Sequence, residues 1–269
     1  MRRMDSRERI TRAFSDASST SDFDRLGEHL WRPIGASTVE LSAPQEGELV
    51  LDACCGNGAS ALPAARRVGP GGHVDAVDLA APLLADLERQ ADGLENITSA
   101  VADVTSWGRS GYDVVQCVLG IFFFSDMTAG TEHLVKRLRP GGRAAVTIWR
   151  RGSMEASGRH LAQAIAAVTG QEFPSRPRHL LDEVNTSEAF GPWLADRGLR
   201  DVEVTESELR LSLSESLAWL VITGSGFAGM LTGLSEDETE RVRQEYLASL
   251  QGAGAAELDA TTLIGVGWA

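Results

Sequence analysis

The stretch LVLDACCGNGASALPAA, residues 49–65, constrains the fold more than any other part of the sequence. An apolar run ends in an acidic residue, a turn of small residues follows, and an alanine-rich stretch comes next. A short apolar run bounded by glycines is typical of a buried strand, and alanine favours a helix. The order therefore predicts a strand, a glycine-rich loop and a helix, which together begin a βαβ unit.

The alternation of short apolar runs with helical stretches continues beyond residue 65, as in proteins built around a parallel sheet. We predict a doubly wound α/β fold in one domain over residues 46–269, preceded by a helical cap over 1–45. Helical additions to the sheet are expected over 151–190 and 214–252, the first with Ser153 as its N-cap. Strands are expected at 48–53, 73–80, 97–104, 112–122, 143–151, 201–213 and 257–269.

Composition and charge narrow the class of function. The chain has 269 residues, 43% of them apolar, and a net charge of −13, which argues against binding a nucleic-acid backbone. The longest apolar run, 112–124, is too short to span a bilayer. The three cysteines, Cys54, Cys55 and Cys117, have no metal-ligand spacing. We therefore expect no metal and no membrane, and a reducing, cytoplasmic location.

The glycine loop does not match two common nucleotide-binding patterns. A P-loop needs a lysine directly after its glycines, and the only lysine of this chain is Lys136. A dinucleotide-binding loop needs G-x-G-x-x-G, whereas the small residues here are Cys54, Gly56 and Gly58. An NAD-dependent short-chain reductase would also need a tyrosine four residues before the lysine, and Glu132 stands there.

A different adenosine site does fit. The loop reads as D-x-G-x-G-x-G with Cys54 at the first glycine position, and Asp78 and Asp103 end the next two expected strands. A carboxylate in the place of Asp78 can accept both hydroxyls of a ribose. An acid beside a backbone N–H, as at Asp103, can pair with an adenine edge. The ordered set predicts a ligand that contains adenosine.

Four short motifs, LDACCGNG, VDLA, ADVTSW and LRPGGR, carry a family resemblance over about Glu48 to Arg150. With them the sequence resembles the class I S-adenosylmethionine-dependent methyltransferases, and among these the ubiquinone/menaquinone-type and natural-product small-molecule enzymes. The resemblance implies a mostly parallel seven-stranded sheet with an antiparallel last strand, and S-adenosylmethionine as cofactor.

The resemblance also implies roles for residues of the first four strands. The methionine end of the cofactor is expected at the glycine loop, the ribose at Asp78 and the adenine between Leu79 and the Asp103–Val104 pair. The residues after the fourth strand, Cys117 to Leu119, are expected beside the sulfonium. The expected cofactor-binding residues are Asp52, Cys54, Gly56, Gly58, Asp78, Leu79, Asp103, Val104 and Cys117.

Structural roles are expected for other polar side chains. Alternation along the second strand predicts that Asp75 faces solvent, away from Val74 and Val77. Asp113 and Tyr112, at the start of the fourth strand, are expected to support the fold, with Tyr112 in the core.

A general base is not evident. Many relatives carry a histidine pair after the fourth strand, and Phe122 and Phe123 stand there instead, before Ser125 and Asp126. The departure favours an acceptor that is already nucleophilic, such as a carboxylate, an amine or an activated carbon. Otherwise a base must come from the additions, in which His160 and His179 are weak candidates.

The acceptor is expected at the open ends of the strands, under the additions. Trp31, at the end of the amphipathic start, could cover the cofactor, and Arg150 could anchor an acidic acceptor. Phe227, with Trp219, could add a further wall. The expected substrate-binding residues are Trp31, Phe122, Phe123, Trp149, Arg150 and Trp219.

These features predict a methyltransferase for a small molecule or modest peptide, in natural-product metabolism, that works by in-line displacement with little acid/base help. Three alternatives stay open: C-methylation of a polyprenyl quinone, a methyltransferase-like binding protein without turnover, and an NAD-dependent reductase. The identity of the acceptor, the atom methylated and the oligomeric state, a homodimer among the options, are left open.

Overall fold

A computed structural model of the chain describes residues 21–171 and 178–269. Its main sheet has seven strands in the order β3-β2-β1-β4-β5-β9-β6. The pairs among β1 to β5 are parallel, and β9 pairs antiparallel with both β5 and β6. This is the predicted doubly wound, mostly parallel sheet. Its strands are β1 Leu49–Ala53, β2 His73–Asp78, β3 Ile97–Val101, β4 Tyr112–Val118, β5 Leu138–Trp149, β6 Arg200–Ser207 and β9 Thr262–Trp268.

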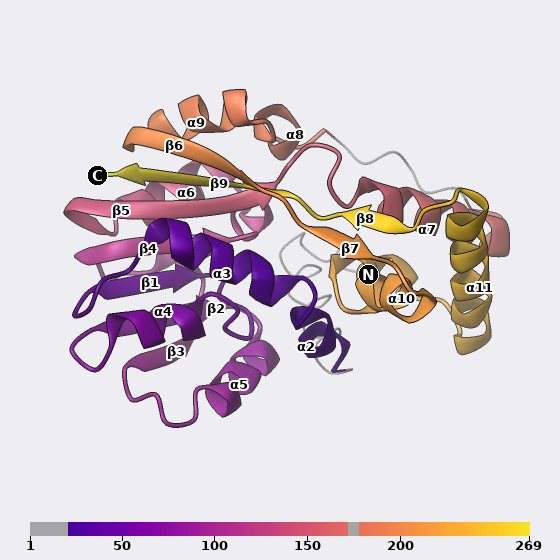
Figure 1. Cartoon of the computed structure of the whole chain (residues 1–269), viewed down its shortest axis with the longest axis horizontal. Coiled ribbons are helices and arrows are strands. Elements are labelled where there is room, and N and C mark those ends of the chain that lie inside the picture. Colours follow the sequence, from indigo (N-terminus) through magenta and orange to yellow (C-terminus); the bar gives the residue numbers. More distant parts are fainter. Residues whose placement is uncertain (1–20, 172–177) are drawn as a thin grey trace, which may run out of the picture.

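Helices cover both faces of the sheet (Figure 1). On one face Val50 and Val114 pack with residues of three helices that include Val39 and Leu84. Alternate residues of the same strands point to the other face, which two helices cover, because successive side chains of a strand alternate. The helices are α3 Trp31–Ser42, α4 Ala61–Val68 and α5 Ala81–Gln90 on the first face, and α6 Met127–Val135 and α9 Ser187–Ala195 on the second.

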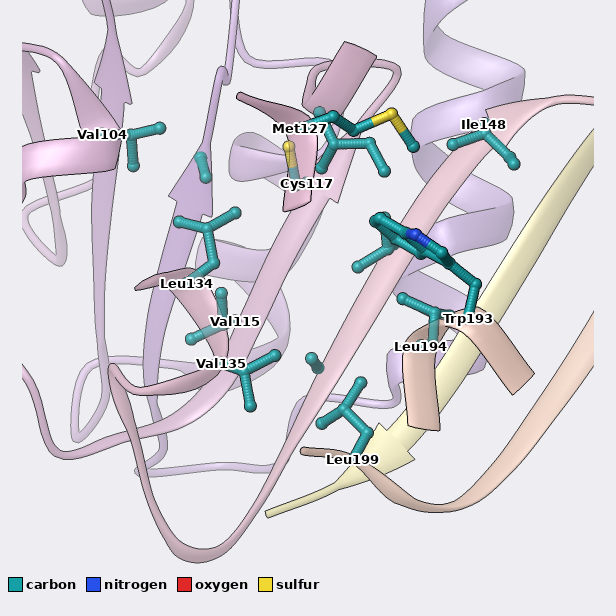
Figure 2. Packing of buried hydrophobic residues seen from close by; sticks show 14 of the residues in the cluster. Val104, Val115, Cys117, Met127, Leu134, Val135, Ile148, Trp193, Leu194 and Leu199 are labelled. Carbon is teal, nitrogen blue, oxygen red and sulfur yellow. The ribbon is translucent and has the colours of Figure 1, made fainter. Parts of the chain in front are cut away.

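The second face carries the largest apolar cluster. Figure 2 shows Leu134 of α6 beside Val115 of β4, and Trp193 and Leu194 of α9 over β5 and β9. Leu134, Leu194 and Val115 are at most 1% exposed. This burial rigidly supports the carboxyl ends of the strands, since close-packed interiors deform little.

The additions gather at one end of the sheet (Figure 1). After β5 come α7 Glu155–Thr169 and the short helix α8 Leu181–Val184, which precedes α9. Between β6 and β9 lie α10 Glu215–Thr223, the 3-10 helix η3 Gly226–Leu231, and α11 Glu236–Gly252. At the N-terminal side, α2 Asp22–Gly27 leads into α3, while the first part of the expected cap, 1–20, lies outside the described residues.

Several boundaries differ from the sequence predictions. The two late strands are each interrupted, and their outer parts, β7 Arg210–Ser212 and β8 Glu257–Asp259, form a separate antiparallel pair. The helical addition expected over 214–252 is interrupted between α10 and η3, where Gly224 packs against Asp22: a Cβ there would lie 2.5 Å from the Asp22 carbonyl oxygen.

Two polar residues are placed differently from the prediction. Asp75 is 6% exposed rather than solvent-facing, because it accepts hydrogen bonds from the Tyr112 hydroxyl at 2.5 Å and from Arg109 at 2.7 Å. The N-cap of α7 is Met154, not Ser153, which makes a turn with Arg150 instead. Tyr112 is buried in the core as predicted.

Candidate functional site

A cavity of about 540 Å³ opens at the carboxyl ends of the parallel strands. The five strands β1 to β5 reach it through residues at or just after their ends, and residues of α3 and of the additions complete its lining. In doubly wound folds the crevice at these strand ends is where ligands bind. Its polar lining includes Asp78 and Asp103, and much of the rest is apolar or aromatic.

The glycine loop after β1 forms one wall. Cys54 and Gly56 line the cavity, and both have left-handed backbone, with φ of 58° and 55°. Gly58, also left-handed at φ 93°, does not line it, because it packs against the helices. A Cβ on Gly58 would lie 3.0 Å from Leu62 Cγ. Gly58 therefore allows the loop to approach α4, and Gly56 presents backbone to the cavity.

Asp78 joins the second strand to this loop. Its Oδ2 accepts the Gly56 N–H at 2.9 Å and its Oδ1 accepts the Ala80 N–H at 2.8 Å. Burial raises the pKa of the Asp78 carboxyl, and the two backbone N–H groups oppose that rise. Each oxygen keeps further capacity to accept a hydrogen bond from a ligand hydroxyl.

The end of β3 adds the second carboxylate. Asp103 caps the 3-10 helix η1, Val104–Ser106, by accepting the Thr105 N–H at 3.0 Å and the Thr105 hydroxyl at 2.7 Å. Val104 and Leu79 also line the cavity; Val104 is buried and Leu79 is 38% exposed.

Asp52 and Cys117 lie behind the cavity wall rather than in it. Asp52 is fully buried, and its Oδ2 accepts hydrogen bonds from Ser60 at 2.7 Å and Gln116 at 2.9 Å. Burial raises the pKa of Asp52 to about 7. Cys117 is buried and packs against the backbone of Gly120. A Cβ added to Gly120 would lie 2.7 Å from the Cys117 Sγ.

Aromatic rings make up a large part of the remaining lining. Trp31, Phe122, Phe123 and Trp149 all line the cavity, as the sequence suggested for substrate contacts. Trp31 and Trp149 are tilted neighbours with ring centroids 6.5 Å apart, and Phe122 and Phe123 meet edge to face at 4.6 Å. Phe227 of η3 also belongs to this aromatic lining.

Two proposed wall residues lie elsewhere. Arg150 does not line the cavity, because its guanidinium donates to Asp259 at 2.5 Å, between the end of β5 and β8. Trp219 packs on Tyr246 of α11, with ring centroids 6.2 Å apart, and is also outside. An anchor for an acidic acceptor at Arg150 is therefore not supported.

The two histidines suggested as bases also lie outside the cavity. His160 Nδ1 is 2.7 Å from the Ser249 hydroxyl, so it joins α7 to α11. His179 Nδ1 accepts the Leu181 N–H at the start of α8. Among the described residues, no histidine, lysine or arginine lines the cavity.

The lining includes residues that were not predicted as site residues, and the large apolar ones on or beside helices are Phe23, Leu83, Met154 and Leu181. Each is one apolar position on or beside a helix, and nothing in the local sequence distinguishes it from a core residue. Phe23 stacks on Trp31 with ring centroids 5.4 Å apart, which is how α2 reaches the site.

Metal-binding clusters and membrane-spanning helices do not occur in the described part of the chain. It has no group of three or more His, Cys, Asp or Glu side chains placed to hold a metal ion. Within residues 21–171 and 178–269, none of the helices combines the length and apolar character needed to cross a membrane.

Comparison with known proteins finds similarity to methyltransferases. A methyltransferase domain family matches residues 50–142. The chain is 35% identical over 153 residues to the aklanonic acid methyltransferase DauC of Streptomyces sp. (strain C5), covering 55% of this chain and 69% of that one. It is 33% identical to the nocamycin O-methyltransferase of Saccharothrix syringae, covering 46% of each chain.

A third relative is named for a naphthoquinone. The 2-phytyl-1,4-naphthoquinone methyltransferase of Nostoc punctiforme is 31% identical over 139 residues, covering 49% of this chain and 59% of that one. The fold also matches a solved structure of Haemonchus contortus phosphoethanolamine N-methyltransferase 2 in complex with S-adenosylhomocysteine. That match has a TM-score of 0.52 and 17% identity, and it covers 87% of this chain and 52% of that one.

Proposed function

Because this chain belongs to the S-adenosylmethionine-dependent methyltransferases, we propose that it methylates an uncharged, aromatic small molecule in natural-product biosynthesis. The observation that carries the proposal is a cavity lined both by two carboxylates, Asp78 and Asp103, and by several aromatic rings. Two relatives are named for small molecules, aklanonic acid and nocamycin, which supports a small-molecule acceptor; the first of these names is that of an acid, so the uncharged acceptor rests on the cavity lining alone. A cytoplasmic location is part of the proposal, and the three cysteines, none of which forms a disulfide, support it.

The two carboxylates in the lining fit the cofactor. The cavity volume, about 540 Å³, is within the range of about 300 to 1,000 Å³ that is typical of small-molecule sites. We propose that Asp78 holds the ribose hydroxyls and that Asp103 and Val104 meet the adenine. With two carboxylates and, among the described residues, no cationic side chain in its lining, the cavity also favours a positively charged ligand.

S-adenosylmethionine, when bound, supplies an activated methyl group for in-line displacement. The chain's own task is then to align the acceptor and to exclude water. Trp31, Phe122 and Trp149 would do both, since flat rings can orient a flat acceptor and leave little room for solvent. No described side chain in the wall is a histidine or lysine, so we propose little acid/base help.

The lining of the cavity also supports an uncharged acceptor. A carboxylated acceptor would need a cation, and Arg150 is already ion-paired with Asp259 outside the cavity. We propose that the additions, 151–190 and 214–252, form the acceptor side through Met154, Leu181 and Phe227, while 46–150 hold the cofactor.

A polyprenyl quinone is the second candidate acceptor. The Nostoc punctiforme relative, named for a phytyl naphthoquinone, favours it, and an apolar cavity would accept a quinone ring. A binding protein without turnover is the third candidate, and only a measurement of transfer separates it from the first two.

Thermal unfolding tests the cofactor site. S-adenosylhomocysteine at 100 times its dissociation constant should stabilise the fold by about 2.7 kcal/mol and raise the midpoint by about 5 °C. NAD at the same concentration should not. Asp78→Ala should abolish the shift, whereas Asp92→Ala, an exposed carboxylate after α5, should keep it. A shift with NAD alone would overturn the assignment.

Transfer of a labelled methyl group tests the acceptor. The protein is incubated with labelled S-adenosylmethionine and three acceptor sets: hydroxylated polycyclic aromatics, a demethylated naphthoquinone, and their carboxylated counterparts. We expect labelled product with uncharged aromatics. Product only with the naphthoquinone favours the second candidate, and binding of S-adenosylhomocysteine without any product favours the third.

A further inference from the structure

Gly158 lies inside α7, where alanine would suit the helix better. Its N–H donates to the Met154 carbonyl oxygen at 3.4 Å, as in a regular helix, and its backbone is not left-handed. Glycine is unfavourable in a helix because it loses more backbone freedom on folding than alanine does. Contact with a ligand does not account for it either, since Gly158 does not line the cavity. A packing reason is therefore expected.

The space that a side chain at Gly158 would fill is taken by the ring of Phe227. A Cβ there would lie 3.0 Å from Phe227 Cε1 and 3.4 Å from Phe227 Cζ. Carbon atoms in favourable contact lie about 3.5–4.0 Å apart. The missing Cβ therefore lets the ring lie closer to α7 than any other residue at position 158 would allow.

Phe227 also lines the cavity, so the position of its ring decides how much room the acceptor has. Its backbone is held in place at the start of η3. The Phe227 N–H donates to the Ser225 hydroxyl oxygen at 3.3 Å, and that hydroxyl donates to the Val221 carbonyl oxygen at 2.6 Å. A group that pushes on the ring would therefore move the side chain rather than the backbone.

The cavity is the side on which the ring has room to move. Elsewhere the ring packs against two clusters of buried apolar side chains, one that contains Leu30 and Met154 and one that contains Leu161 and Ile222. Close-packed side chains yield little to a displaced group. A ring displaced from α7 would therefore enter the cavity and narrow it.

We propose that Gly158 is a specificity-determining residue, which keeps the Phe227 ring against α7 and so leaves room for a larger fused-ring acceptor. The inference rests on the proposed function, the methylation of an uncharged aromatic molecule. It goes further because it assigns the size of the acceptor to a residue that does not itself line the cavity.

Methyl transfer to two phenols of different size tests the proposal. The acceptors are 2-naphthol, with two fused rings, and 2-anthrol, with three, and the measured quantity is the ratio of their kcat/KM values. Gly158→Ala should lower the ratio of 2-anthrol to 2-naphthol about 10-fold, the effect of roughly one methylene in an apolar pocket. Phe227→Ala should raise the ratio, because it removes the ring.

The double variant shows whether the effect passes through the ring. In a chain that already carries Phe227→Ala, Gly158→Ala should change the ratio less than about 2-fold, because the group it displaces is gone. Gly252→Ala is the matched control. It makes the same substitution in a helix, at the end of α11, where nothing lies within 4 Å of the added Cβ, and should leave the ratio unchanged.

Calorimetric titration with S-adenosylhomocysteine shows that each variant is folded and that its cofactor site is intact, and the affinities should agree within about 2-fold. An unchanged ratio in Gly158→Ala would overturn the proposal, as would equal losses with both phenols. An effect of Gly158→Ala that persists without the Phe227 ring would overturn it too. If the wild-type protein binds S-adenosylhomocysteine but methylates neither phenol, the proposed acceptor class fails, and the role of Gly158 fails with it.

Discussion

Gly120 packs closely against the side chains of Cys54 and Cys117 beside the cavity. A Cβ there would lie 2.6 Å from Cys54 Cβ and 2.7 Å from Cys117 Sγ, although its φ of −111° suits any residue. Gly120→Ala should therefore destabilise the fold by overpacking, by about 1–3 kcal/mol in urea unfolding. It should also weaken S-adenosylhomocysteine, because Cys54 and Gly120 both line the cavity. Gly108→Ala is the control: nothing lies within 4 Å of its added Cβ, and equal stability of the two variants would contradict the prediction.

Asp52 should make stability depend on pH. Burial raises its pKa from 3.8 to about 7, so the folded state holds a proton that the unfolded state has already lost. This contribution is fully present below about pH 4 and is lost as the pH rises through 7, by about 4 kcal/mol at most. Above pH 7 it should not change further.

Asp52→Asn isolates that contribution. The amide cannot ionise, so the difference in unfolding free energy between wild type and variant should shift in favour of the variant from pH 5 to pH 8. Urea unfolding at each pH measures it. Parallel pH profiles for the two proteins would mean that Asp52 keeps an ordinary pKa.

At the level of single residues, the sequence best predicted the side chains that stand at strand ends. Asp78 and Asp103 reach the cavity because parallel strands end at one edge. The prediction failed for side chains whose position depends on a hydrogen-bond partner distant in sequence. Asp75 is buried by its bonds to Tyr112 and Arg109, and Arg150 is held by Asp259. No local pattern carries that information.

Among the elements, α11 begins with a capping box. The Ser235 hydroxyl accepts the Glu238 N–H at 3.3 Å, and the Glu238 carboxylate accepts the Ser235 N–H at 2.9 Å. Ser235→Ala should lower the unfolding free energy by about 1 kcal/mol. Glu238→Gln should change little, because glutamine also completes the box. Equal losses in both variants would indicate that charge, not the reciprocal bonds, stabilises this end.

The existence of most strands and helices was predictable, and their interruptions were not. Apolar alternation runs through 201–213, yet the strand divides into β6 and β7. The division depends on the partner strand, because β7 pairs with β8 and β6 with β9. The break after α10 likewise depends on the close approach of Gly224 to α2. To predict either interruption, one would have to know contacts between segments that are distant in sequence.

For the whole molecule, the seven-stranded sheet with its antiparallel last strand was predictable from the family resemblance rather than from hydrophobic patterning, and the order of the strands comes from the structure. It places β9 between β5 and β6, so that seven residues bridge two otherwise separate strands (Figure 1). A chain that stops after residue 261 should therefore fail to unfold cooperatively, because β6 and α9 lose their link to the rest of the sheet. A chain that stops after 268 is the control. Cooperative urea unfolding of the shorter chain would contradict this.

The position of β9 also has a consequence for biosynthesis. A ribosome releases the strands in sequence order, so β1 to β5 can pair while the chain is still growing. Strand β9, which pairs with both β5 and β6, can complete the sheet only after residue 268 has left the exit tunnel. Until then, the apolar face of α9 and Ile148 of β5 stay accessible to solvent. In the finished protein Ile148 is fully buried. The nascent chain is then most exposed to aggregation, and a chaperone that holds it during this time would favour the native sheet.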